Sequence, residues 1–320
     1  MKLNKTEFTD KRTIDWLMKG DASIRWQVMK DLLGKPNRLI EKEREKISKQ
    51  GWGAKLLKRQ DEEGTWAGSL YSRKWISTTY TMLLLRRLGL SPSSPEAKKP
   101  CSILLDKGFY ADGGINYFRS LNHSETCVTG MILSILSYFH YDDQRLESLV
   151  KFLLEQQIAD GGWNCRSFKG DTHSSFHTTM SVLEGLREYE KFKKGRGLEV
   201  RKIQLAAVEF LLNHKLFRSH RTGRIFDSKM TRFSFPTGWR YDVLRGLDYF
   251  QEADIPFDNR MEEAIELVVR RKTKDGKWLV QNRHPGKTYF EMEQVGKPSR
   301  WNTLRALRVL KRYLKLNNQI

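Results

Sequence analysis

A set of apolar segments recurs along the whole chain and limits the folds that this sequence can adopt. Their first residues are separated by roughly 50 to 60 positions, the period of a repeat protein. Apolar side chains follow helical spacing inside each segment, as Leu304, Leu307 and Leu310 do. A Ser, Thr or Pro stands at or next to the start of most of them, as expected at a helix N-terminus. The segments begin at Ser23, Ser77, Glu125, Ser175, Thr237 and Pro298.

A second, more charged helix precedes each apolar segment. Its pattern, as in MEEAIELVVRRK from Met261, is typical of a helix with one exposed face. An apolar helix needs cover on all sides, whereas an amphipathic helix needs it on one, and two concentric rings satisfy both. We predict the outer helices at Glu7–Met18, Arg38–Arg59, Glu96–Lys107, Gln144–Gln157, Arg201–Asn213 and Asn259–Arg271.

The sequence therefore predicts an all-α fold. It is an α/α toroid (α6–α6 barrel) of six helical hairpins, with apolar helices in an inner ring and charged helices in an outer ring. No Pro/Gly/Ser-rich linker divides the array, so we predict one domain over residues 1–320. An open solenoid satisfies the same pattern. The long loops between paired helices favour closure, because a toroid needs its loops on one face.

Four of these loops open with related turns in which Gly is followed by a large apolar residue. Asp and Gly supply a tight turn. The Trp or Ile after it can pack back between neighbouring hairpins. The turns are Asp61–Trp66, Ala111–Asn116, Ala159–Trp163 and Lys274–Trp278.

The balance of charge favours anionic partners. The chain of 320 residues has a formal net charge of +20. This suits a phosphate-bearing molecule, an acidic glycan or peripheral contact with an anionic membrane surface. A soluble protein with Lys and Arg on outer helix faces gives the same balance. Nucleic acid is disfavoured, because no recognised motif is present and the basic residues are spread rather than clustered.

The cysteines and the N-terminal residues bear on the compartment. Cys101, Cys127 and Cys165 lie far apart without CxxC spacing, which favours a reducing environment. The first 20 residues lack an apolar signal-peptide core, and no apolar run approaches the roughly 18 residues of a membrane span. These features predict a cytoplasmic protein without a transmembrane segment.

Two of the turns carry a family resemblance. The Gln-to-Trp units Gln60–Trp66 and Gln157–Trp163 resemble the repeats of squalene cyclases and protein prenyltransferase β subunits. The resemblance covers nearly the whole chain. It implies a toroid with its active cavity at the inner-helix N-termini and a substrate of the isoprenoid class. Toroids of this kind also serve as non-enzymatic domains.

The resemblance can be tested against catalytic motifs. Neither the DxDD acid motif of class II terpene cyclases nor a DDxxD diphosphate motif is present. The nearest acidic cluster is His140–Glu147, where we interpret Asp142 and Asp143 as helix caps. Standard terpene cyclase chemistry is therefore disfavoured.

A zinc site is implied by the same resemblance. Protein prenyltransferases bind zinc through Asp-x-Cys at one inner-helix start and His at the next. Here Glu125, Cys127 and His177 stand in the matching places, with Glu in place of Asp. Thiolate, imidazole and carboxylate are all ligands that zinc accepts. In the alternative interpretation without zinc, Cys127 is a small core residue and His177 is a hydrogen-bonded helix cap.

Alignment of the inner helices on their leucines predicts a substrate site at the rim. Three segments share an arginine followed by an aromatic and a polar residue, and guanidinium groups near helix N-termini suit a phosphate, diphosphate or carboxylate. The aromatic rings can wall an apolar group or face a cation. The predicted substrate-binding residues are Arg25, Trp26, Arg240, Tyr241, Asp242, Arg300 and Trp301.

The opposing arc offers acid–base chemistry. His123, Glu125, His173 and His177 lie on or beside the third and fourth inner segments. We predict Glu125, His177 and His123 as catalytic groups, because carboxyl and imidazole are the usual general acids and bases. The structural alternative is that the arginines pair with acids such as Asp242 to close the ring, with the aromatics as core.

A long aromatic loop precedes the last helix. Gly286–Pro298 carries Tyr289, Phe290, Glu291 and Glu293, and a loop of this length often covers or enters a cavity.

Three functions fit these patterns. The first is an isoprenoid-type prenyltransferase or cyclase-like enzyme that holds an apolar substrate by an anionic, diphosphate-like group. The second is a non-catalytic toroid that binds an anionic glycan or lipid-like ligand. The third is a toroidal polysaccharide lyase or hydrolase acting on uronic acids with Arg, His, Tyr and acidic residues.

Overall fold

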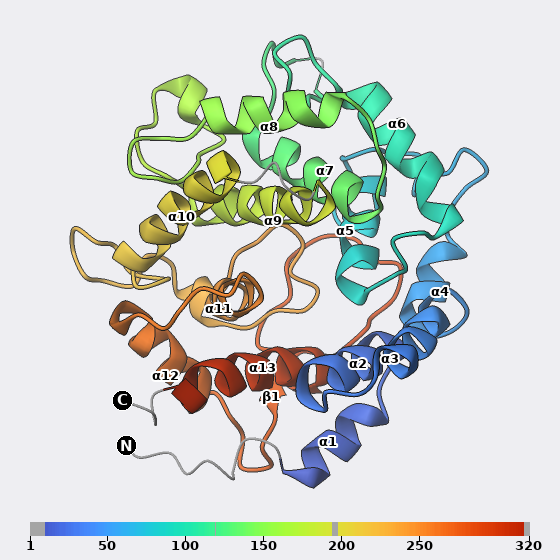
Figure 1. Ribbon diagram of the computed structural model, residues 1–320, viewed down its shortest axis with the longest axis vertical. Coiled ribbons are helices and arrows are strands. Elements are labelled where there is room, and N and C mark those ends of the chain that lie inside the picture. Colours follow the sequence, from blue (N-terminus) through green and yellow to red (C-terminus); the bar gives the residue numbers. More distant parts are fainter. Residues whose placement is uncertain (1–9, 119, 194–197, 317–320) are drawn as a thin grey trace.

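The computed structural model describes residues 10–118, 120–193 and 198–316, and within them the fold is helical (Figure 1). The predicted all-α class is confirmed. The inner helices are α2 (Ala22–Gln27), α5 (Thr78–Leu88), α7 (Thr126–Tyr138), α9 (Phe176–Phe192), α11 (Val243–Glu252) and α13 (Arg300–Leu316). The outer helices are α1 (Lys11–Met18), α3 (Asn37–Arg44), α4 (Gly51–Leu57), α6 (Lys98–Gly108), α8 (Arg145–Glu155), α10 (Leu198–Asn213) and α12 (Glu262–Arg270).

Shorter elements complete the described chain. A π-helical turn, Val28–Leu32, continues α2. Turns of 3₁₀-helix lie at Glu45–Ser48, Pro95–Ala97, Ser167–Lys169, Ser228–Thr231 and Asn259–Met261. Strands β1 (Trp278–Leu279) and β2 (Pro298–Ser299) pair antiparallel, so the loop between them leaves and returns at the N-terminus of α13.

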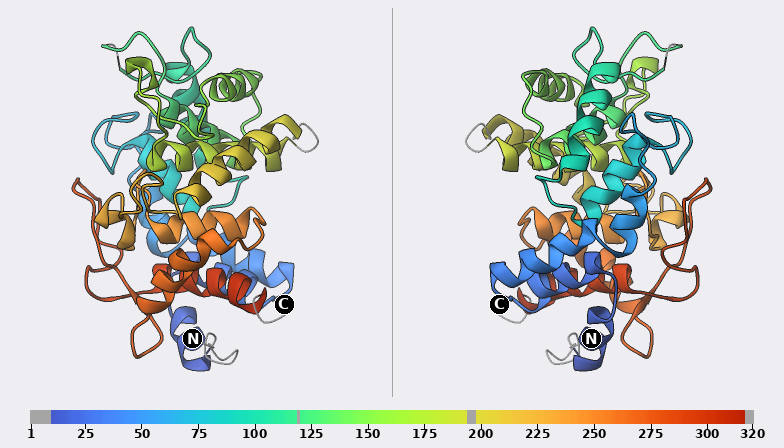
Figure 2. Two further views of the ribbon diagram at one scale, coloured as in Figure 1. Left: turned by 90° about the vertical axis from the view of Figure 1, so that its left-hand side faces the viewer. Right: turned by 90° about the vertical axis from the view of Figure 1, so that its right-hand side faces the viewer.

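The inner helices close into a ring. Helix α5 packs on α7, α7 on α9, α11 on α13, and α13 on α2. Side chains make the two remaining links: Arg245 of α11 donates to Glu184 of α9 at 2.7 Å, and the Trp26 indole of α2 donates to the Leu88 carbonyl of α5 at 2.9 Å. Figure 1 shows α6, α8, α10, α12 and α1 at the periphery, and the side views in Figure 2 place α1 and α13 at the same end of the molecule.

Helices α7 and α9 pack backbone to backbone. A Cβ on Gly130 would lie 2.8 Å from the Val182 Cα, and one on Gly185 would lie 2.4 Å from the Gly130 carbonyl oxygen. Any larger side chain at either position would push the two helices apart. The two glycines therefore fix the closest contact of the ring.

The repeated Trp turns have a repeated structural role. Trp66, Trp163 and Trp278 are fully buried. Each indole N–H donates to the carbonyl ten residues earlier in the outer helix, at 2.7 to 2.8 Å. Each backbone N–H donates to a Thr hydroxyl in the next inner helix, at 3.0 to 3.1 Å. Buried indole groups need such partners, so the motif ties both helices of a hairpin to their loop.

The preceding glutamines link successive hairpins. Gln60 donates to the Glu96 carbonyl at 3.0 Å, and Gln157 to the Ile203 carbonyl at 3.1 Å. In both cases the acceptor lies on or beside the outer helix of the following hairpin. The Gln-to-Trp units therefore act as architectural connections.

Two predicted elements differ from the structure. The outer helix predicted over Arg38–Arg59 is broken into α3, a 3₁₀ turn and α4, with Gly51 at a positive φ of 69° between them. The segment predicted from Thr237 becomes helical only at Val243, because the Asp242 carboxylate accepts the Arg245 N–H at 2.8 Å and caps α11 there.

The core joins every helix except α3. Buried apolar side chains from Leu17 to Tyr313 form one continuous cluster. A single domain over residues 1–320 stays a prediction. No helix among the described residues is long and apolar enough to cross a membrane.

Candidate functional site

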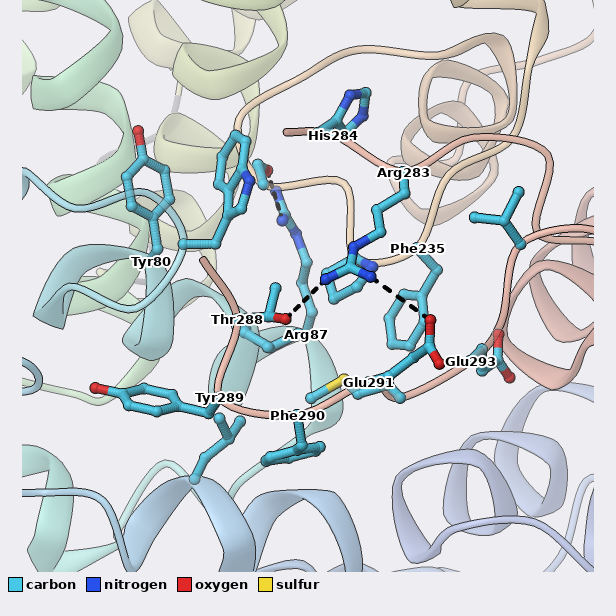
Figure 3. Close-up of a pocket in the computed structure, with 17 residues that line it drawn as sticks. Tyr80, Arg87, Phe235, Arg283, His284, Thr288, Tyr289, Phe290, Glu291 and Glu293 are labelled. Carbon is cyan, nitrogen blue, oxygen red and sulfur yellow. Dashed lines mark hydrogen bonds and ion pairs between the residues drawn. The ribbon is translucent and has the colours of Figure 1, made fainter. Parts of the chain in front are cut away.

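Two cavities lie within the ring, and Arg87 lines both. The rim pocket, of about 60 Å³, lies beside the N-terminal end of α5 and under the loop that contains residues 283–295. Figure 3 shows Tyr80, Phe235, His284 and Glu291 around it. The central cavity, of about 630 Å³, lies between the middle and C-terminal parts of the inner helices and outer helix α3.

The predicted loop covers the rim pocket. Its backbone pairs with the Lys74–Trp75 segment through reciprocal N–H to carbonyl bonds with Lys287 at 3.0 Å. The Tyr289 hydroxyl donates to the Ile76 carbonyl at 3.0 Å, and Arg283 contacts Glu291 at 3.6 Å (Figure 3). These bonds hold the loop against the N-terminus of α5.

Next to this pocket lies a group of polar residues that we call the rim site: Tyr80, Glu125, His177, Trp239 and Arg240. They come from the first turns of α5 and α9, the cap of α7 and the turn before α11. The sequence places them at helix starts, where the chain leaves a loop, and of the five Tyr80 lines the rim pocket itself. Three of them are predicted site residues.

Glu125 is the buried acid of the rim site. One carboxyl oxygen, Oε2, is buried and has no hydrogen-bond partner. Burial raises the pKa of this carboxyl, and the positive charge of Lys74 opposes the shift. At a given pH, a larger fraction of Glu125 is therefore protonated and neutral than of an exposed glutamate.

Tyr80 lies within the electrostatic reach of both Glu125 and Arg240. Burial raises the pKa of its phenol, with Glu125 adding to the shift and Arg240 opposing it. A hydrogen bond with the Tyr71 side chain also opposes the shift. The ring packs edge-on against Trp75 at 4.9 Å and against Tyr71 at 5.3 Å.

Trp239 sits among cations and an imidazole. The Arg240 guanidinium lies 4.7 Å and the Lys74 ammonium 5.7 Å from its ring centroid. His177 meets the ring edge-on at 5.1 Å. The Nε atom of Arg240 is buried without a partner, so this arginine keeps unused hydrogen-bonding capacity.

His177 is held as a neutral group. Its Nδ1 accepts the Tyr241 backbone N–H at 2.9 Å. Burial, followed by the charges of Arg240 and Arg245, lowers the pKa of His177 to about 4. A neutral imidazole that accepts at Nδ1 carries its proton on Nε2. His177 therefore offers a hydrogen-bond donor at Nε2 and is not poised as a base there.

His123 and His173 lie outside the rim site as we define it. His123 packs its ring on Phe168 at 3.9 Å, and its Nε2 is buried without a partner. His173 is exposed and bonds the Thr172 hydroxyl at 3.0 Å. A catalytic role for His123 stays a prediction.

The structure does not bring the three predicted arginines together. Arg25 pairs with Glu43 at 2.5 Å and donates to the Gly20 carbonyl at 2.6 Å. Arg300 stacks on Trp16 at 4.5 Å and donates to its carbonyl. Both reach toward outer elements, so the predicted common arc is wrong and Arg240 alone lies at the rim site. The leucine alignment failed because Arg240 precedes α11 rather than lying within it.

The polar and aromatic partners of these arginines are mostly structural. Asp242 caps α11 and accepts from Ser234. Tyr241 is buried and donates to the Leu216 carbonyl at 2.7 Å. Trp26 and Trp301 line the central cavity instead, and Trp301 stacks on Phe235 at 4.6 Å.

The predicted zinc ligands are not assembled. No three His, Cys, Asp or Glu side chains within the described residues are grouped as a metal site. Cys127 pairs with Cys165, whose Sγ accepts the Cys127 N–H at 3.1 Å, and His177 Nδ1 is taken by Tyr241. The hydrogen bond to Cys165 and burial raise the pKa of Cys127, which disfavours the thiolate that zinc needs.

The central cavity is lined by charges that the sequence analysis did not single out. Its described lining includes nine cationic and six anionic side chains. The cations are Lys30, Arg44, Arg86, Arg87, Arg187, Lys191, Arg245, Arg305 and Arg308, and the anions are Asp31, Glu41, Glu184, Glu188, Asp248 and Glu252. One pattern in the sequence could have predicted this lining: charged residues lie within helices that are otherwise apolar enough to be fully buried. Arg305 and Arg308, between Leu304 and Leu310, are examples.

Two carboxylates bridge several arginines in this cavity. Glu184 contacts Arg245 at 2.7 Å, Arg86 at 2.8 Å and Arg87 at 3.3 Å. Asp248 contacts Arg305 at 2.9 Å and also holds Arg308. The three arginines around Glu184 hold its pKa well below the usual range against the opposing effect of burial.

No protein-family model and no curated protein matches the sequence. Among solved structures, a polysaccharide lyase aligns over 97% of this chain and 98% of its own, with a TM-score of 0.50 and 10% identity. A protein from Actinoplanes covers 94% and 97%, with a TM-score of 0.48 and 16% identity. The type II terpene cyclase MstE from Scytonema covers 89% and 100%, with a TM-score of 0.33 and 11% identity.

These likenesses bear on the fold alone. The alignment with the lyase spans both chains nearly end to end, so the helical, toroid-like architecture is shared. At 10% identity it carries no residue of a site from one protein to the other.

Proposed function

We propose that the rim site binds a small amphiphilic molecule with one anionic group, of the isoprenoid type, and exchanges a proton with it. One observation carries the proposal. Glu125 Oε2 and Arg240 Nε are both buried without hydrogen-bond partners, next to an aromatic-walled pocket that Tyr80 lines. Unpaired buried polar groups cost roughly 1 to 3 kcal/mol each, and a ligand with matching polar atoms lowers that cost.

Each residue has a chemical role in this proposal. Arg240 takes the anionic group, because a guanidinium with a free N–H makes strong charge-assisted bonds to phosphate or carboxylate. Trp75 and Trp239 face the apolar part and any positive charge that develops on it. Glu125, whose pKa is raised by burial, donates a proton and takes it back as the carboxylate. His177 supplies a fixed hydrogen-bond donor.

An acidic sugar is the second candidate ligand. Arg240 and Lys74 can together neutralise a uronate carboxylate, and a lyase that shares the fold is named for polysaccharides. The rim pocket holds only about 60 Å³ under the covering loop. Its lining is largely aromatic and apolar, which favours the apolar part of an amphiphilic molecule over a hydrophilic polymer, so the amphiphilic molecule comes first.

Ligand binding is the first test. Purified protein is titrated with prenyl diphosphates, pyrophosphate alone and acidic oligosaccharides, and the melting temperature and Kd are measured. A prenyl diphosphate should bind more tightly than pyrophosphate, because only the former has an apolar chain that can contact the aromatic lining of the pocket. Absence of binding by every compound, or tighter binding of the oligosaccharide, contradicts the proposal.

Proton transfer is the second test. Glu125→Gln keeps the shape of the side chain and removes the acid, so product formation should fall by roughly 10²- to 10⁴-fold while ligand affinity is nearly kept. The matched control is Glu43→Gln, since Glu43 pairs with Arg25 away from the rim site. If the wild-type protein binds the ligand but forms no product, it is a binding protein and the catalytic part of the proposal is refuted.

A further inference from the structure

The central cavity has the size of a ligand site and lies apart from the rim site. Its volume of about 630 Å³ falls in the range of roughly 300 to 1,000 Å³ found for small-molecule pockets. Its walls differ in kind from the aromatic rim pocket, because charged side chains from four inner helices, the π-helical turn and outer helix α3 dominate them. If these charged side chains served only to hold the ring closed, we would expect equal numbers of positive and negative groups among them.

The charges do not balance. The described lining carries three more positive than negative side chains. Glu184 and Asp248 are each shared by two or more arginines, so neither carboxylate is left to neutralise the excess. Arg87, between Arg245 and Arg86, has its pKa lowered to about 9 by burial and by these neighbouring cations.

Hydrogen-bonding capacity is also unused. Arg305 is 4% exposed, yet its Nη1 is buried without a partner. The Nε of Arg86 is in the same state. A buried guanidinium N–H without an acceptor is costly, and both residues line the cavity. An anion in this space supplies the missing acceptors and the missing charge together.

We propose that the central cavity binds a small multivalent anion, a compound with several phosphate or carboxylate oxygens, between Arg86, Arg87 and Arg305. Guanidinium groups suit such oxygens because their N–H groups form paired, parallel bonds. The exposed Lys30 and Lys191 also line the cavity. They attract the anion before it meets the buried arginines.

Calorimetric titration at low ionic strength tests the site. Tripolyphosphate and citrate serve as probes, so that the two arms distinguish phosphate from carboxylate chemistry. At least one should bind, and binding should weaken as salt is added. No heat and no shift in melting temperature with millimolar concentrations of either probe would overturn the proposal.

Two variants at accessible positions give effects of opposite sign. Lys191→Gln removes a positive charge and should weaken binding about five-fold, and Glu252→Gln removes a negative charge and should tighten it by a similar factor. Both side chains are at least 39% exposed, so folding should be kept. Lys151→Gln on outer helix α8 is the matched surface control and should leave the Kd unchanged.

A rim variant separates this site from the proposed function. Arg240→Gln should at most remove a second, weaker binding event at the rim and should leave the affinity of the tighter event unchanged, since Arg240 does not line the central cavity. Loss of binding in Arg240→Gln but not in Lys191→Gln would place the anion at the rim and refute the second site. Failure of prenyl diphosphate binding would leave the central cavity proposal untouched.

Discussion

The rim site and the central cavity hold charge in opposite ways. At the rim, Glu125 and Arg240 each keep a buried polar atom without a partner. In the central cavity, Glu184 and Asp248 are each bridged by several arginines. The difference follows from position: at the helix starts no arginine bonds the Glu125 carboxyl, whereas the interior of the ring brings several arginines to each of Glu184 and Asp248. The side chains that surround an arginine of the ring therefore decide whether it binds a ligand or stabilises the fold.

Removal of a central carboxylate should have the largest effect. Asp248 is 8% exposed and holds Arg305 and Arg308. Asp248→Ala leaves the buried Arg305 without its carboxylate and Arg308 with only Asp31 and Glu252, which should lower the free energy of unfolding by roughly 3 to 5 kcal/mol. Urea denaturation followed by circular dichroism measures it. A loss below about 1 kcal/mol would mean that the bridges are not part of what holds the ring.

The arginines give the next test, in affinity rather than stability. Arg240→Gln should weaken prenyl diphosphate binding by roughly 10- to 100-fold, the range expected when a charged hydrogen bond is lost. Arg300→Gln is the matched control, because Arg300 stacks on Trp16 and faces away from the rim. Equal losses of affinity in both variants would mean that Arg240 and Arg300 contact one ligand together, as the common arc predicted and the structure contradicts.

The buried imidazole of the rim makes stability depend on pH. His177 has a pKa of about 4 in the folded protein, against about 6.5 in an unfolded chain. Between these values the unfolded chain binds a proton that the folded chain does not. Stability should therefore fall as pH drops from about 6.5 and level off below about 4.

The variant His177→Gln isolates this contribution. The wild type should lose more stability between pH 7 and pH 5 than the variant does, measured by urea denaturation at both pH values. His284 has its pKa lowered in the same direction and is present in both proteins, so it cancels in the difference. Identical pH profiles would show that His177 is not buried as a neutral group.

An exposed ion pair should give the smallest effect. Lys151 and Glu155 lie 3.9 Å apart on α8, with side chains 78% and 60% exposed. Glu155→Gln should change the free energy of unfolding by less than about 0.5 kcal/mol, since water screens such pairs. Set against Asp248→Ala, it separates the effect of burial from that of charge. A change above about 1 kcal/mol would weaken that distinction.

The repeated architecture could be predicted from the sequence. Helical spacing of leucines and the Gly-x-Trp turns indicated the helical class, the pairing of inner with outer helices and the role of the turns. These signals are local, because each Trp bonds a carbonyl ten residues away and a Thr in the next helix. The loop 286–298 was also predicted to cover a cavity, because a long loop with several aromatic side chains needs an apolar surface to pack against.

The tertiary structure decided which polar residues meet. Arg25, Arg240 and Arg300 share a sequence pattern but not a location, because a capping Asp delays α11 past Arg240 and outer helices draw the other two away. The partners Glu184 and Arg245 are 61 residues apart, and Arg308 and Asp31 are 277 apart. Local patterns fix helices, whereas the rotation of each helix about its axis depends on how all of them pack, and only the folded ring sets it.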